Sequence, residues 1–374
     1  RLLNDPSISI GVELVGGTGI AKEIQLKMLR AGKDVVTANK ALLATHGNEL
    51  YRVAHENNRC IAFEASCVGG VPIIGAIRTG LAANRINAMY GIVNGTCNYI
   101  LSNMSSKEER FSQALAKAQK RGFAEADPTL DISGGDSAHK LAILASIAFG
   151  WEIAVEDVFV EGIDGIARED LRYGREMGYR LKLLAIAQRS EGGRLSLRVH
   201  PSFISAETAL ARVDGSFNAI SVFGSAVGET LFYGRGAGMM PTASAVMADV
   251  IDVALGNSQT TFKHLRLQPR EQIRQFIEPI GEIVTRFYIR VMAKDEPGVV
   301  AKYGKILADH QISISGALQH EGTGPADTVP VVITTHRTQE KNMAAALAEL
   351  RKIDIISGKP VCVRIVDIPQ DKDT

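Results

Sequence analysis

The sequence lacks several features that would assign it to a class of protein at once. Its four cysteines, Cys60, Cys67, Cys97 and Cys362, include no C-x-x-C pair, so we expect neither a disulfide framework nor a zinc site. Neither sign of charge dominates, because 42 basic residues face 41 acidic ones, which argues against a nucleic-acid partner. No uninterrupted apolar run could span a bilayer and no signal peptide opens the chain, so we expect a cytoplasmic protein without a membrane partner.

Two further features are missing near the amino terminus. The chain starts with Arg1 rather than methionine, and Ile10–Val15 already has the composition of a buried strand. The loop Gly16–Gly19 that follows has Lys22 where a third glycine would complete the dinucleotide-binding fingerprint. We therefore expect a fragment whose phosphate-binding turn belongs to an earlier βαβ unit, on the order of 60 residues. The Gly16–Gly19 loop is equally compatible with facing a cofactor and with a plain turn.

What is present is typical of a globular chain with two or three domains, since 45% of the 374 residues are hydrophobic. Residues 1–66 alternate short apolar strands with helices, which predicts an α/β fold, the remainder of a Rossmann-like doubly wound parallel sheet. The expected strands are 10–15, 34–38 and 60–65, and the expected helices are 21–31 and 48–57.

Residues 67–260 change character and predict an α+β domain for catalysis and dimerisation. The expected helices are 73–82, one opened by a capping box at 106–109 and closed by Gly122, 136–149 and 240–255; the expected strands are 181–187, 195–199 and 220–232. Residues 257–285 are polar and predict a linker. Residues 286–374 give the order βαββαβ, a ferredoxin-like unit.

The segment from Gly122 to Leu141 is the richest in chemistry, because it concentrates acidic residues beside a lysine. Asp136 and Lys140 are four residues apart, so they share a helix face that continues into the apolar Ile143. An inward lysine with an acidic partner suits proton transfer. The alternative is a buried salt bridge without chemistry. His139 lies off the apolar stripe, and we expect it at the surface.

Three other polar stretches follow expected strands or precede an expected helix. Val35–Lys40 brings Lys40 to the carboxyl end of a strand, where open α/β sheets bind ligands. Phe63–Val71 combines a carboxylate with a glycine-containing bend, whose oxygens suit a hard cation. Gly234–Ala243 is a glycine-rich entry to a helix and could approach an anionic ligand. Each stretch also has a simpler interpretation: a solvated lysine, an ordinary bend and close packing, respectively.

Taken together and in this order, these stretches resemble the homoserine dehydrogenase family. The resemblance is carried by Val36–Lys40, Glu64–Pro72, Asn94–Thr96, Glu125–Thr129, Asp136 with Lys140, and Gly234–Asp249. It implies NADP- or NAD-dependent interconversion of L-aspartate 4-semialdehyde and L-homoserine, in the biosynthesis of threonine, methionine and isoleucine. The choice between NAD and NADP depends on residues outside this chain. The segment 234–256 would return to the nucleotide-binding domain.

The resemblance also implies roles for individual residues. Lys140 resembles the catalytic lysine that exchanges the hydroxyl proton, with Asp136 beside it, and Glu125 resembles the acid that binds the substrate ammonium. The same pocket would be lined by Asp131, Gly95 and Thr96. The cofactor would be contacted by Lys40, Thr37, Asn39 and Gly236. A Na⁺ ion would be bound by the side chain of Glu64 and the main-chain oxygens of Cys67, Gly69 and Val71.

The sequence departs from the family at Phe123, where a tyrosine is frequent, so one hydroxyl contact is missing. Residues 286–374 resemble an ACT domain, with Asp295–Gly298 at the first strand–helix turn. This resemblance implies an amino-acid effector such as threonine and a homodimer or homotetramer; the alternative is a domain that only dimerises. Two other functions remain open at this point. They are a non-catalytic amino-acid sensor and a dehydrogenase of the same architecture for another amino-acid aldehyde.

Overall fold

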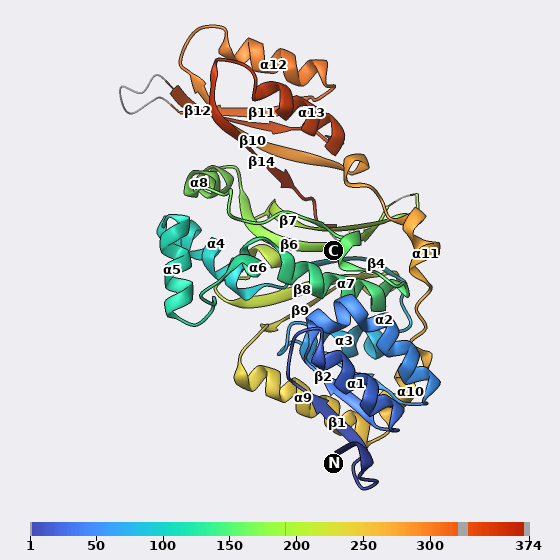
Figure 1. Ribbon diagram of the computed structural model, residues 1–374. Coiled ribbons are helices and arrows are strands. Elements are labelled where there is room, and N and C mark those ends of the chain that lie inside the picture. Colours follow the sequence, from blue (N-terminus) through green and yellow to red (C-terminus); the bar gives the residue numbers. More distant parts are fainter. Residues whose placement is uncertain (1, 191, 321–327, 370–374) are drawn as a thin grey trace.

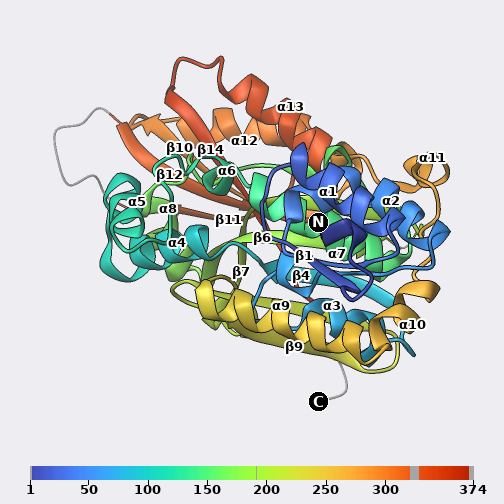
Figure 2. The ribbon, with the colours of Figure 1, turned by 60° about the horizontal axis from the view of Figure 1, so that its bottom comes forward.

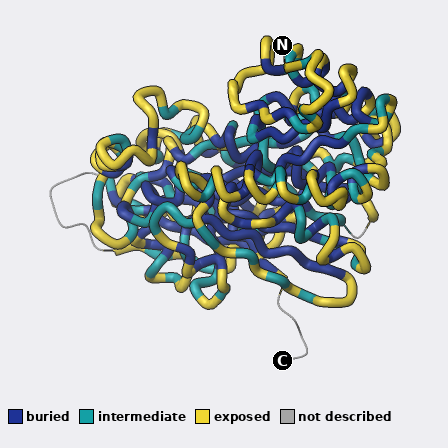
Figure 3. Tube along the Cα trace, turned by 90° about the horizontal axis from the view of Figure 1, so that it is seen from below, coloured by how far each residue is buried: buried dark blue, intermediate teal, exposed yellow. Residues whose placement is uncertain are grey.

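The computed structural model describes residues 2–190, 192–320 and 328–369 (Figure 1). Three units follow one another along the long axis of Figure 1: a small parallel sheet near the N-terminus, a large sheet in the middle and a C-terminal unit at the top. Figure 3 shows that the buried segments run through the interior while the exposed ones line the outside. Most buried apolar residues of the first two units belong to one continuous core, and a separate cluster in the central unit contains Tyr90, Leu184 and Phe223.

The small sheet is parallel, with the order β1-β2-β3. Its strands are β1 (Ile10–Glu13), β2 (Asp34–Thr37) and β3 (Ile61–Ala62), connected by α1 (Ile20–Arg30) and α2 (Lys40–Glu56). α9 (Met239–Ala254) packs against all three strands, although it is distant in sequence. Figure 2 shows α9 on the side of the sheet away from α1 and α2. The expected doubly wound arrangement is therefore confirmed, with helices on both faces.

The large sheet has eleven strands, with the main order β11-β12-β10-β14-β7-β6-β4-β8-β9. Its central strands are β4 (Ile86–Ile92), β5 (Phe159–Val160), β6 (Tyr179–Arg189), β7 (Leu195–Ser205), β8 (Phe217–Gly224) and β9 (Gly228–Arg235). The helices of this unit are α3 (Ile73–Gly75), α4 (Gly95–Lys107), α5 (Phe111–Lys120), α6 (Thr129–Ile132), α7 (Gly135–Phe149) and α8 (Arg168–Glu176). Both α4 and α7 pack on β6, so the sheet supports the segments that carry the polar motifs.

The C-terminal unit has the predicted βαββαβ order. Its elements are β10 (Val284–Lys294), α12 (Val299–Asp309), β11 (Ile314–Gln319), β12 (Thr328–Thr335), the short β13 (Thr338–Gln339), α13 (Glu340–Leu350) and β14 (Ile356–Ile365). β14 pairs in parallel with β7 at Arg364↔Ser202 and Ile365↔Phe203. This pairing makes the sheet of the C-terminal unit continuous with the central one.

Several expected boundaries are wrong, each for a local reason. α2 begins at Lys40 rather than at residue 48, because the Asn39 side chain caps it by accepting from the amide of Leu42. The expected capping box at 106–109 does not open a helix: α4 runs through it to Lys107, and Glu108 ends it in a left-handed conformation. Residues 257–285 contain α10 (Asn257–His264) and α11 (Arg270–Ile273), so this segment is structured rather than a plain linker.

Among the described residues no single helix is both long and apolar enough to cross a bilayer. The pair α9 and α10 together passes the test of length and composition, but the two helices are bent by 89°.

Buried ion pairs join the C-terminal unit to the central one. Asp170 of α8 is fully buried and accepts hydrogen bonds from Arg290 Nε at 2.6 Å and from the Tyr288 hydroxyl at 2.9 Å, both on β10. Arg364 of β14 is also buried and forms ion pairs with Glu161 and Glu340. Because an unpaired charge in such a place is costly, these contacts hold the two units in one relative position.

We predict that Asp170→Asn lowers the free energy of unfolding by about 3 kcal/mol, since Arg290 would lose its buried carboxylate. Urea-induced unfolding measures the effect. The matched control is Glu169→Gln, the preceding residue, whose ion pair with Arg168 is exposed and should change stability by less than about 1 kcal/mol. Equal effects of the two substitutions would contradict the structural importance of the buried pair.

Candidate active site

The first turn of α7 places Asp136 and Lys140 side by side in the interior. Lys140 Nζ lies 2.7 Å from Asp136 Oδ2, and the two side chains are only 12% and 7% exposed. Gly134, in the left-handed conformation just before the helix, allows the helix start to approach the sheet, because a Cβ there would lie 2.9 Å from Val160. The expectation that the pair faces inward is confirmed.

Two further side chains, those of Lys40 and Asn94, converge on the same carboxylate. Lys40 Nζ, at the first turn of α2, lies 3.2 Å from Asp136 Oδ1. The Asn94 amide donates to Asp136 Oδ2 at 2.8 Å and to Asp131 Oδ1 at 2.7 Å. Lys140 also donates to the main-chain oxygen of Val93 at 2.7 Å. The small sheet, the β4–α4 turn and the α6–α7 turn thus meet at one point.

The two aspartates of this cluster differ in their electrostatic environment. Burial by itself would raise the pKa of Asp136, but the charges of Lys140 and Lys40 and the hydrogen bonds from Lys140 and Asn94 hold it well below its usual value. Burial raises the pKa of Asp131, and the charge of Asp136 adds to this effect against the hydrogen bond from Asn94. Asp136 therefore stays ionised at neutral pH as the fixed counter-charge of both lysines.

Two of the residues expected at the cofactor, Thr37 and Asn39, donate to the buried carboxylate of Glu13, which was not among the predicted site residues. Glu13 is 1% exposed and accepts from the amides of Val15 at 2.7 Å and Gly16 at 3.1 Å and from the Thr37 hydroxyl at 2.9 Å. Asn39 Nδ2 donates to the main-chain oxygen of Gly17 at 2.8 Å. Burial would raise the pKa of Glu13, but the hydrogen bond from Gln25 and those from Gly16, Thr37 and Val15 keep it below its usual value. The sequence did contain a signal for Glu13, because an acidic residue inside an otherwise apolar strand is unusual.

The loop held by Glu13 fits a nicotinamide nucleotide. It lies at the carboxyl ends of β1 and β2, where open α/β sheets bind their ligands. Gly16 and Gly17 have φ values of 80° and 71°, and a Cβ at either would meet no atom within 4 Å, so the main chain borders open space. Lys40, 36% exposed, lies at the same edge and connects it to Asp136.

The bend between β3 and α3 contains the residues expected to bind Na⁺. Glu64 accepts from the amides of Ile74 at 2.9 Å and Gly75 at 2.7 Å, so its carboxylate lies at the start of α3. Burial raises the pKa of Glu64. The described residues contain no group of three or more His, Cys, Asp or Glu side chains suited to a metal. A site here would therefore depend on the main-chain oxygens of the bend, which belong to Cys67, Gly69 and Val71.

The returning segment packs directly on this bend. The amide of Gly70 donates to the main-chain oxygen of Arg235 at 2.9 Å, and the oxygen of Gly236 lies 3.4 Å from the Cβ position of Gly69. Gly236 is buried against Asn218, and a Cβ there would collide with that side chain. Only glycine fits this place, which brings the segment between β9 and α9 beside the bend.

The residues expected around the substrate lie in neighbouring segments. Glu125 is exposed, and its carboxylate has no hydrogen-bond or ion-pair partner in the described chain, so it is free to bind a ligand. The Thr96 hydroxyl donates to the main-chain oxygen of Phe123, which ties the Glu125 segment to the start of α4. Gly95 lies at this start, close to Ser216, and a Cβ would come within 2.7 Å of its main-chain oxygen.

The expectation that His139 lies at the surface is wrong. His139 is half-buried, because α2 packs across α7 and covers a second face of the helix. Within the described part of the chain its buried Nδ1 has no hydrogen-bond partner. Burial lowers the pKa of His139, although the charge of Asp136 opposes the effect. The apolar periodicity of α7 alone could not predict this second contact, because a distant segment of the chain makes it.

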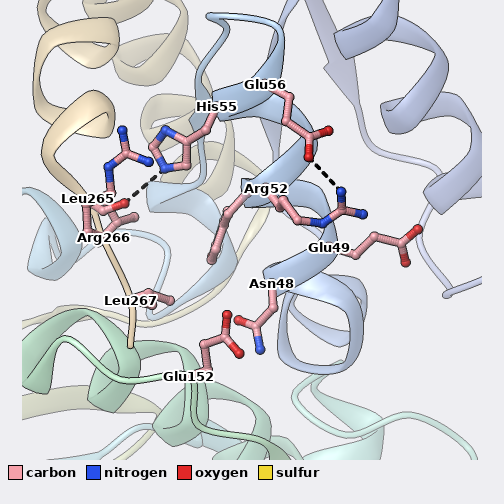
Figure 4. A pocket seen from close by; sticks show the side chains of 10 residues that line it. Asn48, Glu49, Arg52, His55, Glu56, Glu152, Leu265, Arg266 and Leu267 are labelled. Carbon is pink, nitrogen blue, oxygen red and sulfur yellow. Dashed lines mark hydrogen bonds and ion pairs between the residues drawn. The ribbon is translucent and has the colours of Figure 1, made fainter. Parts of the chain in front are cut away.

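A cavity of about 570 Å³ lies on the other side of α2, between that helix and the segment Leu265–Leu267 (Figure 4). Figure 4 shows the Arg52–Glu56 pair on α2 and the hydrogen bond between His55 and the main-chain oxygen of Leu265. Neither lysine of the Asp136 cluster lines this cavity, so it is separate from the candidate active site.

The parallel sheet with its ligand-binding edge and the inward lysine define the chain as a nicotinamide-dependent dehydrogenase carrying an additional C-terminal unit. Comparison with known families agrees. Residues 72–251 match the model described as homoserine dehydrogenase, residues 1–64 match the homoserine dehydrogenase NAD binding domain, and residues 287–354 match the ACT domain. The chain belongs to the homoserine dehydrogenase family. It is an NAD(P)-dependent oxidoreductase, as the resemblance in the sequence implied.

Individual relatives support this assignment. The homoserine dehydrogenase of Pseudomonas aeruginosa is 46% identical over 96% of this chain and 84% of its own length, and that of Neisseria gonorrhoeae is 46% identical over 96% and 83%. The crystal structure of a homoserine dehydrogenase from Thiobacillus denitrificans has a TM-score of 0.88 at 46% identity, covering 98% of this chain and 84% of that one. A hyperthermophilic archaeal homoserine dehydrogenase mutant in complex with NADPH has a TM-score of 0.60 at 31% identity, covering 68% and 74%.

We predict that Glu13→Ala speeds hydrogen exchange at the amides of Val15 and Gly16 by about tenfold or more, because each loses its buried acceptor. Hydrogen–deuterium exchange with mass spectrometry measures this in the peptide that covers the Gly16–Gly19 loop. Glu23→Ala is the control, since that carboxylate is exposed on α1 and should leave the loop unchanged. Unaltered protection in Glu13→Ala would show that the carboxylate does not hold the loop.

Proposed function

We propose that Lys140 transfers the proton in the interconversion of L-aspartate 4-semialdehyde and L-homoserine. The observation that carries this proposal is the 2.7 Å contact of Lys140 with Asp136 in the interior. In reduction, the Lys140 ammonium donates a proton to the oxygen of the substrate carbonyl; in oxidation, the Lys140 amine takes it back from the hydroxyl. Asp136 positions the nitrogen for this transfer. Asp131, Gly95 and Thr96 line the substrate side of this site.

The substrate is an amino acid, so its ammonium needs a carboxylate. Glu125 is exposed and free of side-chain partners in the described chain, and Thr96 ties its segment to the start of α4. We assign to Glu125 the binding of the substrate ammonium, which fixes the position of the carbonyl relative to Lys140. Charge-assisted hydrogen bonds of this kind give both orientation and affinity.

Lys40, Thr37, Asn39 and Gly236 are proposed to border the cofactor, which is NADP or NAD. Lys40 is supported by its position between the open edge of the small sheet and Asp136. Thr37 and Asn39 act by holding the Gly16–Gly19 loop in place. The nicotinamide supplies the hydride when it is bound. Na⁺ is proposed at the bend formed by Glu64, Cys67, Gly69 and Val71, supported by its carboxylate and main-chain oxygens.

The remaining proposals concern organisation and control. We assign residues 1–66 to the cofactor domain together with 234–256, residues 67–260 to the catalytic and dimerisation domain, 257–285 to the connection and 286–374 to the ACT domain. The protein is proposed to be a cytoplasmic homodimer or homotetramer in the biosynthesis of threonine, methionine and isoleucine. An amino acid such as threonine is the proposed effector at the Asp295–Gly298 turn of the ACT domain.

We predict that Lys140→Ala lowers kcat for homoserine oxidation by about 10²–10⁴-fold with a much smaller change in KM, because positioned proton transfer acts in the transition state. Steady-state kinetics on the full-length polypeptide, with NAD and NADP in turn, measure both constants. Asp136 keeps Lys40 as a partner in this variant, so the fold should survive. Lys27→Ala, at an exposed site on α1, is the control. An unchanged kcat would remove Lys140 from the role.

We predict that Glu125→Leu, unlike Lys140→Ala, changes KM rather than kcat. The KM for homoserine should rise by about 10–100-fold, the value of one charge-assisted hydrogen bond, while kcat at saturation changes little. Initial rates over a wide range of homoserine concentration give both constants. Glu207→Leu, another exposed glutamate, should leave both unchanged. A fall in kcat at constant KM would assign Glu125 to the chemical step rather than to substrate binding.

A further inference from the structure

A second cavity, of about 510 Å³, lies between the central sheet and the ACT domain, away from the candidate active site. We call it the junction pocket. Strands of the central sheet form one wall. The start of β10 and the segments next to it form the other. The residues that line it include Tyr90, Ser190, Arg194, Arg198, Glu278 and Arg337. The pocket is also distinct from the Asp295–Gly298 turn, because that turn follows the end of β10, whereas the pocket contains Val284 and Thr285 at its start.

Arg198 of β7 lines the junction pocket and is 6% exposed. Its guanidinium donates to the Ser196 hydroxyl at 2.6 Å, but no carboxylate of the described residues forms an ion pair with it. Burial without such a partner lowers the pKa of Arg198 to about 10. A guanidinium in this position is a buried charge that lacks its counter-charge.

Arg364, on the neighbouring β14, shows the usual solution for a buried arginine. It is 5% exposed and has two carboxylate partners, Glu161 and Glu340. Of the carboxylates that line the pocket, Glu278 and Glu282 are bound to Arg194 at 3.2 and 2.7 Å, and Asp367 is bound to Arg286 at 3.4 Å. The described carboxylates around the pocket are therefore committed elsewhere, and they act on Arg198 only from a distance.

The walls of the pocket also contribute hydrogen-bond donors. Arg337 and Tyr90 line it, and Ser190 contributes a buried hydroxyl with no hydrogen-bond partner in the described chain. His200 lies on the same face of β7, and burial together with the charges of Arg364 and Arg198 holds the pKa of His200 well below its usual value. The histidine is therefore neutral and does not change the charge balance.

We propose that the junction pocket binds a small oxyanion, of the carboxylate or phosphate type, as the counter-charge of Arg198. Removing a charge from water costs several kcal/mol unless an opposite charge compensates it, and a bound anion supplies that compensation. Arginine is suited to planar and tetrahedral oxyanions, because its guanidinium presents parallel N–H groups. Because both units form the walls, the anion also strengthens the contact between the catalytic sheet and the ACT domain.

The test compares thermal unfolding of the full-length protein in sodium phosphate or sodium acetate with unfolding in sodium chloride at equal ionic strength. At least one oxyanion should raise the Tm in a saturable way, since a ligand at 100 times its Kd shifts the folding equilibrium about 100-fold. Phosphate alone would indicate a phosphate-type ligand, and acetate alone a carboxylate. Isothermal titration calorimetry with the active probe should give one site per chain that depends on Arg198.

Three variants make the result specific to the pocket. Arg198→Met should abolish the oxyanion-dependent rise in Tm without loss of stability in chloride, because it removes an uncompensated buried charge. Arg198→Lys keeps the charge and should retain part of the rise. Arg364→Met should lower the Tm in every buffer but keep the full rise. The proposal is overturned if no oxyanion exceeds chloride, or if Arg198→Met responds as the wild type does.

Discussion

The structure depends most on one shared carboxylate. Asp136 accepts from Lys140 of its own helix and pairs with Lys40 of the small sheet, while Asn94 bridges it to Asp131. Burial makes this arrangement demanding, because each charge must find its partner away from water. The same arrangement also fixes the relation between units, because Lys40 can reach Asp136 only when α2 and α7 lie in their observed relative position. The geometry of the proposed catalytic site and the packing of the first two units are therefore one constraint.

A chain of contacts connects this carboxylate to the ACT domain. Arg364, in the last strand of that domain, pairs with Glu161, whose amide donates to the main-chain oxygen of Val199 at 2.8 Å. The next residues pack on the turn before α7: the amide of Ile163 donates to the oxygen of Ile132 at 2.8 Å, and Gly162 leaves no room there for a Cβ. An effector that moves β14 would thus act on the backbone a few residues from Asp136.

The sequence could predict the parts of this molecule in which local periodicity and packing agree. The inward direction of Asp136 and Lys140 followed from the apolar face of α7, and the βαββαβ order followed from clean alternation in the last domain. It could not predict contacts made by distant segments. His139 is half-buried because α2 crosses α7, and Glu13 is buried because Gln25 and Thr37 reach it from other elements. The wrong capping box at 106–109 shows the same limit, since the Asn94 cap had already started α4 upstream.

Some charged side chains have oppositely charged partners within the chain and others do not, and this difference distinguishes permanent contacts from groups available to ligands. Asp136, Asp170 and Arg364 have all their partners within the chain, so their contacts fix the relation between units. The exposed Glu125 and the buried Arg198 lack charged partners among the described residues, and Arg198 lines the junction pocket. Leaving a carboxylate in water without a partner costs little free energy, whereas leaving a buried guanidinium without one costs much more. This difference fits the two proposed roles: a substrate that binds and dissociates at Glu125, and an anion that stays bound at Arg198 as part of the folded protein.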